Sequence, residues 1–270
     1  MNLRAGGLHR QMTSFVLNAS TIFLTAFLLF VVQPLLGKYL LPWFGGSSSI
    51  WAVSLLFFTT MLFVGYLYVY LLTRYVGRWQ PVVHLSIIAI VFASVLYALF
   101  SQQALFSNLT WLSFSHIDPA LAVLFALLIT IGGPYFLLST TGPLVQYWHG
   151  ISSQREPYAL YALSNVASLL ALVSYPILIE PYVPLHLEQS IWARLFLVYL
   201  IVLAVVCVRL ISAGVLHKRK VTAEEMDTAT VSKIMLLKWI ALAALPAFLL
   251  VATTTQITHV IAPVPLLWTI

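Results

Sequence analysis

Long apolar runs, each close to the length of a bilayer crossing, alternate with short polar segments along the chain of 270 residues. A helix that crosses a hydrocarbon core of about 30 Å needs about 20 mainly apolar residues. The runs that meet this condition cover residues 14–37, 50–72, 81–100, 119–139, 158–179, 191–213 and 238–257. An eighth apolar run begins near residue 264. The pattern predicts an all-α, polytopic transmembrane helix bundle with seven spans and an incomplete eighth.

The composition excludes most soluble proteins. Apolar residues make up 61% of the chain and charged residues only 7%, whereas a soluble domain has roughly 45–50% and about 25%. Twenty charged side chains, 13 basic and seven acidic, are too few to cover a water-soluble globule of this size. A soluble enzyme, a nucleic-acid-binding module and a disordered tail are therefore excluded. The expected partner is the lipid bilayer, and no nucleic acid is expected.

The basic residues predict the orientation of the spans, because cytoplasmic loops carry an excess of Lys and Arg. With the N-terminus inside, the outer face receives only Lys38 and Arg194. The inner face receives eleven: Arg4, Arg10, Arg74, Arg78, Arg155, Arg209, Lys218, Arg219, Lys220, Lys233 and Lys238. We therefore expect a cytoplasmic N-terminus.

One charged segment divides the chain. The basic run His217–Lys220 is followed by Glu224, Glu225 and Asp227. This predicts a six-helix transmembrane unit over 1–213, a cytoplasmic linker over 214–232 and the start of a second, truncated transmembrane unit over 233–270. Such an outline is typical of two-halved secondary transporters.

Four phrases of the sequence resemble a bacterial family. They are FVVQPLLGK (30–38), STTGPLVQYW (139–148), YALYALSNVASLLALVSYPILIEP (158–181) and TTTQITHVIAPVPLLW (253–268). They are similar to the membrane-spanning part of fused major-facilitator/spermidine-synthase-like proteins. The resemblance implies a major-facilitator-like six-helix unit in the bacterial inner (plasma) membrane, and it covers the membrane part only.

Catalysis is not expected from this chain. An aminopropyl-transfer site must bind a cationic amine and a nucleoside, which calls for several carboxylates and a Gly-rich turn after a strand. Three of the seven acidic residues lie in the predicted linker. None of the seven histidines has an i,i+4 partner of the kind that binds metal on a helix, so we expect interface or loop histidines, with no metal, haem or other cofactor.

Polar residues within the spans are the candidate sites, because they are costly in lipid and often functional. On the fifth span, Tyr158, Tyr161, Asn165, Ser168 and Tyr175 follow an approximate helical stripe. This stripe predicts either an aqueous cavity that binds a polar solute or a helix–helix seam. The small-residue pairs that favour the seam are Ser164 with Ser168 and Ala167 with Ala171.

Two other spans contain prolines beside polar residues. Gln33 precedes Pro34. Its amide is expected either to satisfy a backbone carbonyl freed by the proline or to contact a neighbouring helix. This indicates a structural kink, with a gating or substrate-binding role as the alternative. The fourth span contains Gly132-Gly133-Pro134 and Thr140-Thr141-Gly142-Pro143. These segments predict either a functional break in the helix or only the glycines and prolines that are common in membrane helices. Thr140, Thr141 and Gln146 are candidates there for solute binding or gating. Residues 143–149 are expected at the inner interface.

Lys38 and Glu180 lie at the predicted outer ends of the first and fifth spans. We expect them to pair as an outer gate or strut. The alternative is that Lys38 extends alone to the lipid headgroups.

Two functions remain open. The first is translocation of an unknown small polar solute by alternating access, which predicts a water-accessible cavity around Asn165. The alternative is a non-transporting membrane anchor or regulatory module of a spermidine-synthase-like protein, with a soluble synthase-like domain or partner. That alternative predicts a packed, dry face around Asn165.

Overall fold

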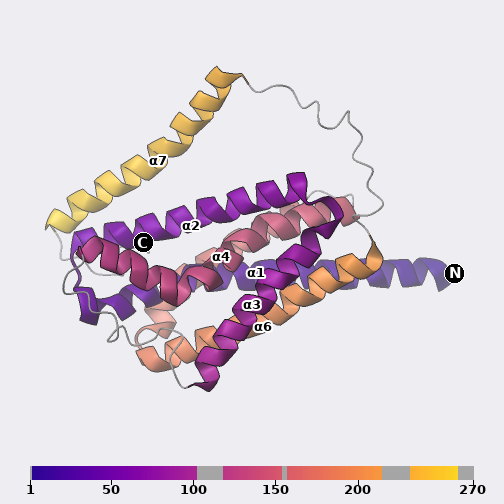
Figure 1. Cartoon of the computed structure of the whole chain (residues 1–270), viewed down its shortest axis with the longest axis horizontal. Helices are drawn as coiled ribbons and strands as arrows, with labels where there is room; N and C mark the ends of the chain where they lie inside the picture. The colour runs from indigo at the N-terminus through magenta and orange to yellow at the C-terminus, as the bar shows by residue number, and fades with distance from the viewer. Residues whose placement is uncertain (1, 102–117, 154–156, 215–231, 261–270) are drawn as a thin grey trace.

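The structure is a computed structural model that describes residues 2–101, 118–153, 157–214 and 232–260 (Figure 1). Its helices are α1 (Asn2–Phe44), α2 (Ser48–Tyr75), α3 (Gln80–Phe100), α4 (Pro119–Ser153), α5 (Tyr158–Ser174), α6 (Leu185–Ala213) and α7 (Lys233–Val260). A 3₁₀ turn, η1 (Gly77–Trp79), precedes α3, and a π-helical turn, η3 (Tyr175–Ile179), extends α5. The described part of the chain contains no strand.

Seven helices are long and apolar enough to cross a membrane, which confirms the all-α, multi-pass prediction. They correspond in order to the seven predicted runs. The incomplete eighth run lies outside the described residues, as do the basic and acidic groups of the predicted linker. The division into two transmembrane units stays a prediction.

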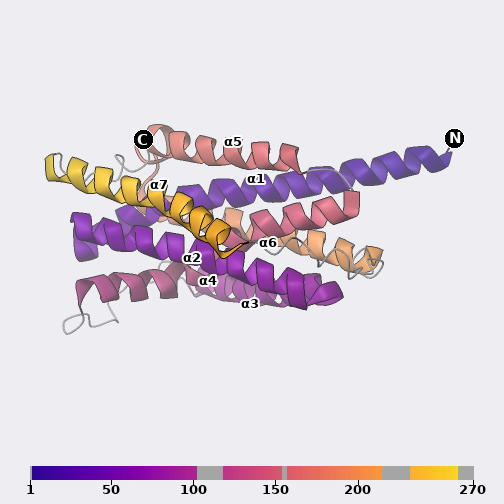
Figure 2. The same ribbon diagram turned by 90° about the horizontal axis from the view of Figure 1, so that it is seen from above.

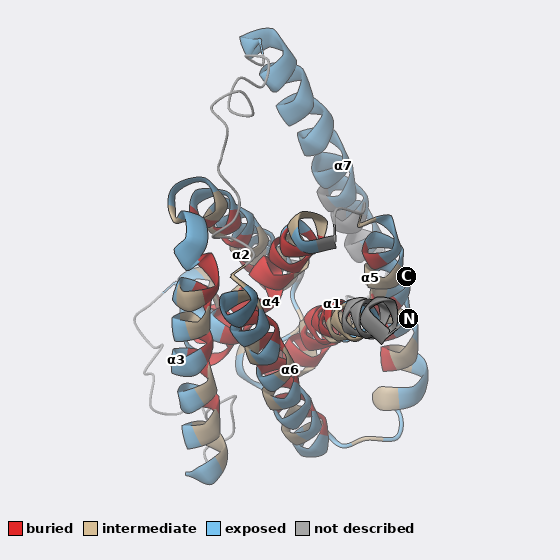
Figure 3. Ribbon diagram, turned by 90° about the vertical axis from the view of Figure 1, so that its right-hand side faces the viewer, coloured by how far each residue is buried: buried red, intermediate tan, exposed pale blue. Residues whose placement is uncertain are grey.

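Two helices form the centre of the bundle. Buried residues concentrate on α1 and α4, whereas the outer faces of α3, α5 and α6 are exposed (Figure 3). Helix α1 packs against α4, α5 and α6, helix α4 packs against α2, and helix α3 packs against α6. Figure 2 shows α5 lying along α1. The amides and hydroxyls of α1 and α4 are thus placed inside the bundle.

Helix α4 is longer than predicted. It continues through Pro134 and Pro143 to Ser153, so neither proline-containing segment breaks it. Residues 143–149 are helical, and Leu144, Val145 and Trp148 are buried. The expected position of this segment at the inner interface stays a prediction, but its Trp148 packs between helices.

Helices α2 and α4 approach closely at Gly65. A methyl group added at this glycine would overlap the side chain of Ser139 on α4. Gly65 therefore permits a backbone approach that a larger residue would block, as small residues commonly do between membrane helices.

Helix α7 lies outside the packed six-helix bundle and has a small contact with α2 (Figures 1 and 3). Every side chain of α7 whose burial is described is exposed. Two ends of the six-helix bundle are named below: the Glu188 end, where α1 finishes and α6 begins, and the Arg78 end, where α3 begins and α6 finishes.

Candidate functional site: a buried ion pair and a polar interior

The corner between α5 and α6 positions the first group of polar side chains. Pro176 lies in η3, and the widened turn closes with a hydrogen bond of 2.8 Å from the Glu180 amide to the Tyr175 carbonyl. Helix α6 then begins after Pro184, which puts Glu188 in its first turn. A carboxylate at that position interacts favourably with the helix dipole. π-helical turns occur often at functional sites.

Glu188 is held by two other helices. Lys38 Nζ of α1 lies 2.7 Å from Glu188 Oε1, and Tyr175 Oη donates a hydrogen bond of 2.9 Å to Glu188 Oε2. The Glu188 side chain is fully buried, and that of Lys38 is 25% exposed. Both carboxylate oxygens are therefore satisfied by groups from α1 and η3.

The predicted pairing of Lys38 with Glu180 was wrong. Lys38 was correctly expected to pair, but its partner is Glu188, so the alternative of a lone Lys38 was wrong as well. Glu180 is only half-buried. The fully buried Glu188 carboxylate loses more hydration and therefore needs the opposite charge more strongly.

A second polar contact lies deeper in the bundle. Gln33 Nε2 of α1 donates a hydrogen bond of 3.2 Å to Tyr135 Oη of α4. The Tyr135 side chain is fully buried against the rings of Phe57 and Phe58, whose centroids lie 6.2 and 5.1 Å from its own. Of the two roles expected for Gln33, the contact with a neighbouring helix is the one observed.

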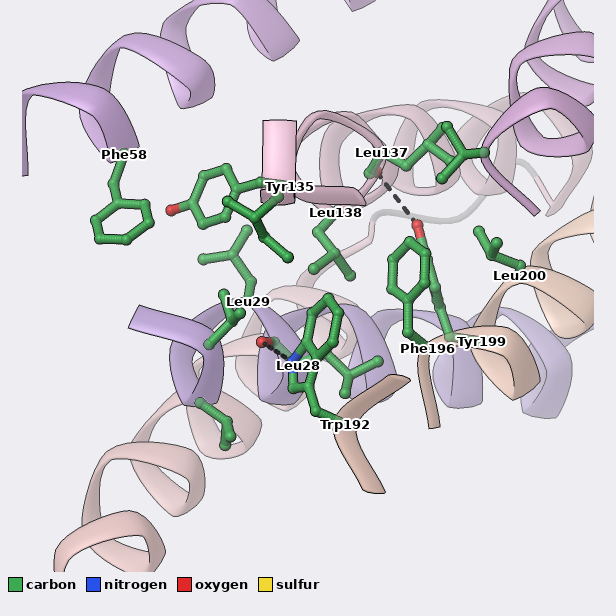
Figure 4. Close-up of a cluster of buried hydrophobic side chains, with 14 of the residues drawn as sticks. Leu28, Leu29, Phe58, Tyr135, Leu137, Leu138, Trp192, Phe196, Tyr199 and Leu200 are labelled. Atoms are coloured by element: carbon green, nitrogen blue, oxygen red, sulfur yellow. Dashed lines mark hydrogen bonds between the residues drawn. The ribbon is translucent and has the colours of Figure 1, made fainter. Parts of the chain in front are cut away.

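A third polar group links α4 and α6. Thr141 Oγ1 lies 2.6 Å from Tyr199 Oη. The tyrosine hydroxyl also donates to the Leu137 carbonyl at 3.2 Å, the bond drawn in Figure 4. Thr140 donates its own hydroxyl to the same carbonyl at 2.9 Å. Trp192 Nε1 of α6 donates to the Leu28 carbonyl of α1 at 3.1 Å (Figure 4). The two predicted threonines thus belong to a buried network between helices.

The candidates on α5 do not join this interior. Tyr158 and Tyr161 are 71% and 50% exposed, and Asn165 is also exposed, while Ser168 is half-buried. Tyr175 alone among the predicted stripe is buried. Tyr158 and Tyr175 are 17 positions apart. At about 100° per residue this separation falls about 100° short of five full turns, so the two side chains lie on different faces of the helix.

The face of α5 that packs against α1 is made of small residues. Ala167 and Ala171 are fully buried there, together with Leu160. The small-residue seam was one of the two predicted roles for α5, and this pair provides it. The polar face with Tyr161 and Asn165 points away from the seam.

Polar side chains also meet near the Arg78 end. His84 is buried with its Nδ1 atom 3.2 Å from Tyr68 Oη, and His149 Nδ1 lies 3.2 Å from Asn18 Nδ2. Positions near the inner face were predicted for these histidines, and both rings are enclosed between helices near the Arg78 end. Gln146, a predicted candidate, is buried on the same part of α4.

Comparisons with known protein families, curated proteins and solved structures found no match to this chain. The resemblance to major-facilitator/spermidine-synthase-like proteins therefore stays an expectation.

Proposed function

We propose that this chain is a transporter-like membrane domain that moves a small polar solute by alternating access. The observation that carries the proposal is the Lys38–Glu188 ion pair at one end of the bundle. Ionisable groups inside membrane helices are rare and commonly belong to solute or ion pathways. A buried ion pair adds little stability compared with apolar packing, so an anchor gains little from it. A gate gains a contact that forms in one conformation and breaks in another.

The packing of the helices supports the proposal. The first three helices can be matched in order with the second three, so that α1 corresponds to α4, α2 to α5 and α3 to α6. Under this exchange the α2–α4 contact becomes the α5–α1 contact, and both are extensive. The α1–α4 and α3–α6 contacts map onto themselves, whereas the extensive α1–α6 contact maps onto the slight α3–α4 contact. Inverted three-helix repeats, which build many transporter folds, account for the first of these correspondences but not for the last.

The exposed face of α5 indicates where a solute would pass. Asn165 is an exposed amide two turns into the membrane span Tyr158–Ile179, where contact with lipid is unfavourable, and Tyr161 lies one turn before it. A second helical unit facing α5 would enclose a polar pathway, with α1 and α4 behind it. In this proposal the ion pair closes the pathway at the Glu188 end.

Cysteine accessibility tests the proposal without knowledge of the solute. Cys207 is the chain's single cysteine and is buried, so Cys207→Ser provides the background. Asn165→Cys is then labelled in proteoliposomes with a membrane-impermeant thiol reagent. We expect labelling, and a change of about tenfold in its rate when Lys38→Met opens the pair, since about 1.4 kcal/mol in a conformational equilibrium corresponds to that factor.

Val198→Cys is the matched control. Val198 lies near the middle of α6 and is 49% exposed on its outer surface, so it should stay unreactive in both backgrounds. If Asn165→Cys is as unreactive as Val198→Cys, and Lys38→Met changes neither, the face is dry and the chain acts as an anchor or regulatory module.

A further inference from the structure

A groove opens on the bundle surface at the Arg78 end, between the start of α3 and the end of α6. Its volume is about 230 Å³. Its lining includes Arg78 and Trp79 of η1, Pro81 and Val82 of α3, and Leu210 and Ile211 of α6. The groove therefore combines one cation and one indole with an apolar floor.

The level of the groove corresponds to a membrane interface. It lies where the spans of α3 and α6 reach their ends. Trp79 is 54% exposed there, and tryptophan is enriched where lipid headgroups meet the acyl region. The Arg78 guanidinium carbon lies 5.4 Å from the centre of the Trp79 ring, so the charge is held beside the indole at the mouth of the groove.

The charge distribution favours an anionic occupant. Asp118, Glu180 and Glu188 lie where α4 and α6 begin and α5 finishes, at the opposite end. Arg74 at the end of α2 and Arg209 near the end of α6 lie at the groove's own end. The predicted topology assigns eleven of the 13 basic residues to this side, against four of the seven acidic residues (Glu156, Glu224, Glu225 and Asp227). The excess of positive charge on this side favours an anion at Arg78.

Apolar side chains form the floor of the groove. Pro81 and Val82 of α3 lie there opposite Leu210 and Ile211 of α6, and the two helices pack against each other. A free inorganic anion has no apolar part to cover such a floor, whereas an anionic headgroup with attached acyl chains does.

We propose that this groove is a binding site for an anionic glycerophospholipid. Arg78 holds the phosphate, Trp79 packs beside the headgroup, and the first carbons of an acyl chain cover the apolar floor between α3 and α6. The site lies apart from the ion pair at Glu188 and does not depend on the proposed transport activity.

Native mass spectrometry of the delipidated full chain tests the site. The protein is titrated with phosphatidylglycerol and phosphatidylcholine of the same acyl composition. We expect the wild type to retain phosphatidylglycerol preferentially. Arg78→Gln should weaken its binding by about tenfold, since a charge-assisted contact to phosphate is lost, and should leave phosphatidylcholine binding unchanged.

Two further variants separate the groove from general surface charge. Arg194→Gln removes an exposed arginine near the other end of α6 and should retain wild-type selectivity. Ile211→Trp should fill the groove from a position that is already 43% exposed, and should also weaken phosphatidylglycerol binding.

Three results would overturn the assignment. In the first, the wild type binds both lipids equally. In the second, Arg194→Gln loses as much selectivity as Arg78→Gln. In the third, inorganic phosphate alone raises the melting temperature as much as phosphatidylglycerol does, which would indicate a phosphate site rather than a lipid site.

Discussion

Lys38 and Glu188 lie 150 positions apart in the chain and meet at a distance of 2.7 Å, which ties the end of α1 to the start of α6. The tie is asymmetric, because the Glu188 side chain is fully buried and that of Lys38 is 25% exposed. Removing either partner therefore has different consequences. Loss of Lys38 leaves a buried negative charge, while loss of Glu188 leaves a lysine that is still able to reach water.

Lys38→Met is expected to lower the free energy of unfolding by about 2–3 kcal/mol, near the lower limit for breaking a buried pair because Lys38 is partly solvated. Adding Glu188→Gln should recover most of this loss, since the amide still accepts from Tyr175 without carrying charge. Equilibrium unfolding in mixed micelles measures both effects.

Glu180→Gln is the matched control for this cycle. It should change stability little and act additively with Lys38→Met, because Glu180 is half-buried and is not the partner of Lys38. A coupling energy between Lys38 and Glu180 as large as that between Lys38 and Glu188 would contradict the observed pairing.

Gly65→Ala is expected to destabilise the α2–α4 interface by about 1–3 kcal/mol, the usual cost of inserting a methyl group into a filled space. The added methyl group would overlap Ser139, so Ser139→Gly in the same molecule should recover part of the loss. Unfolding of the two single variants and the double variant measures this coupling.

Gly142→Ala provides the comparison within α4. A methyl group there meets no atom within 4 Å, and alanine favours a helix by up to about 1 kcal/mol over glycine. We expect unchanged or increased stability. Equal losses for Gly65→Ala and Gly142→Ala would show that close packing is not the cause.

The sequence was sufficient to predict the seven spans, because apolar length is visible in one dimension. It was insufficient to identify Glu188. The apolar run suggested a sixth span starting at 191, which left Glu188 in a loop, whereas α6 begins at Leu185. A hydropathy profile ends a predicted span at the first charged residue. The helix itself continues through that residue when a partner neutralises its charge.

The α5 stripe shows a different limit of sequence reasoning. Offsets of three, seven and ten residues stay close to one face, but small angular differences accumulate over five turns. Tyr175 consequently reaches the interior while Tyr158 stays exposed. Tyr135, Tyr199 and Trp192 were missed for a related reason: an aromatic ring looks apolar in a hydropathy profile, although its polar atom bonds across helices.

Tyr199→Phe is expected to lower stability by about 0.5–1.5 kcal/mol, the range for a hydrogen bond between membrane helices or in a protein interior. The ring stays packed, but its hydroxyl contacts with Thr141 and Leu137 are lost. Thr141→Val should cost a similar amount, and the double variant should cost less than the sum. Strict additivity would show that the two hydroxyls do not interact.

The orientation of the chain gives the last prediction. Arg74, Arg78 and Arg209 lie at one end of the bundle, and the described carboxylates lie at the other. The excess of basic residues predicts that the Arg78 end lies in the cytoplasm. In a Cys207→Ser background, Ser49→Cys at the start of α2 should then react with an impermeant thiol reagent in intact cells, because Ser49 is exposed at the Glu188 end. Thr228→Cys, in the predicted linker outside the described residues, should react only after permeabilisation.

The reverse labelling pattern would invert the topology and move the ion pair to the cytoplasmic side, where it would close an inner rather than an outer gate.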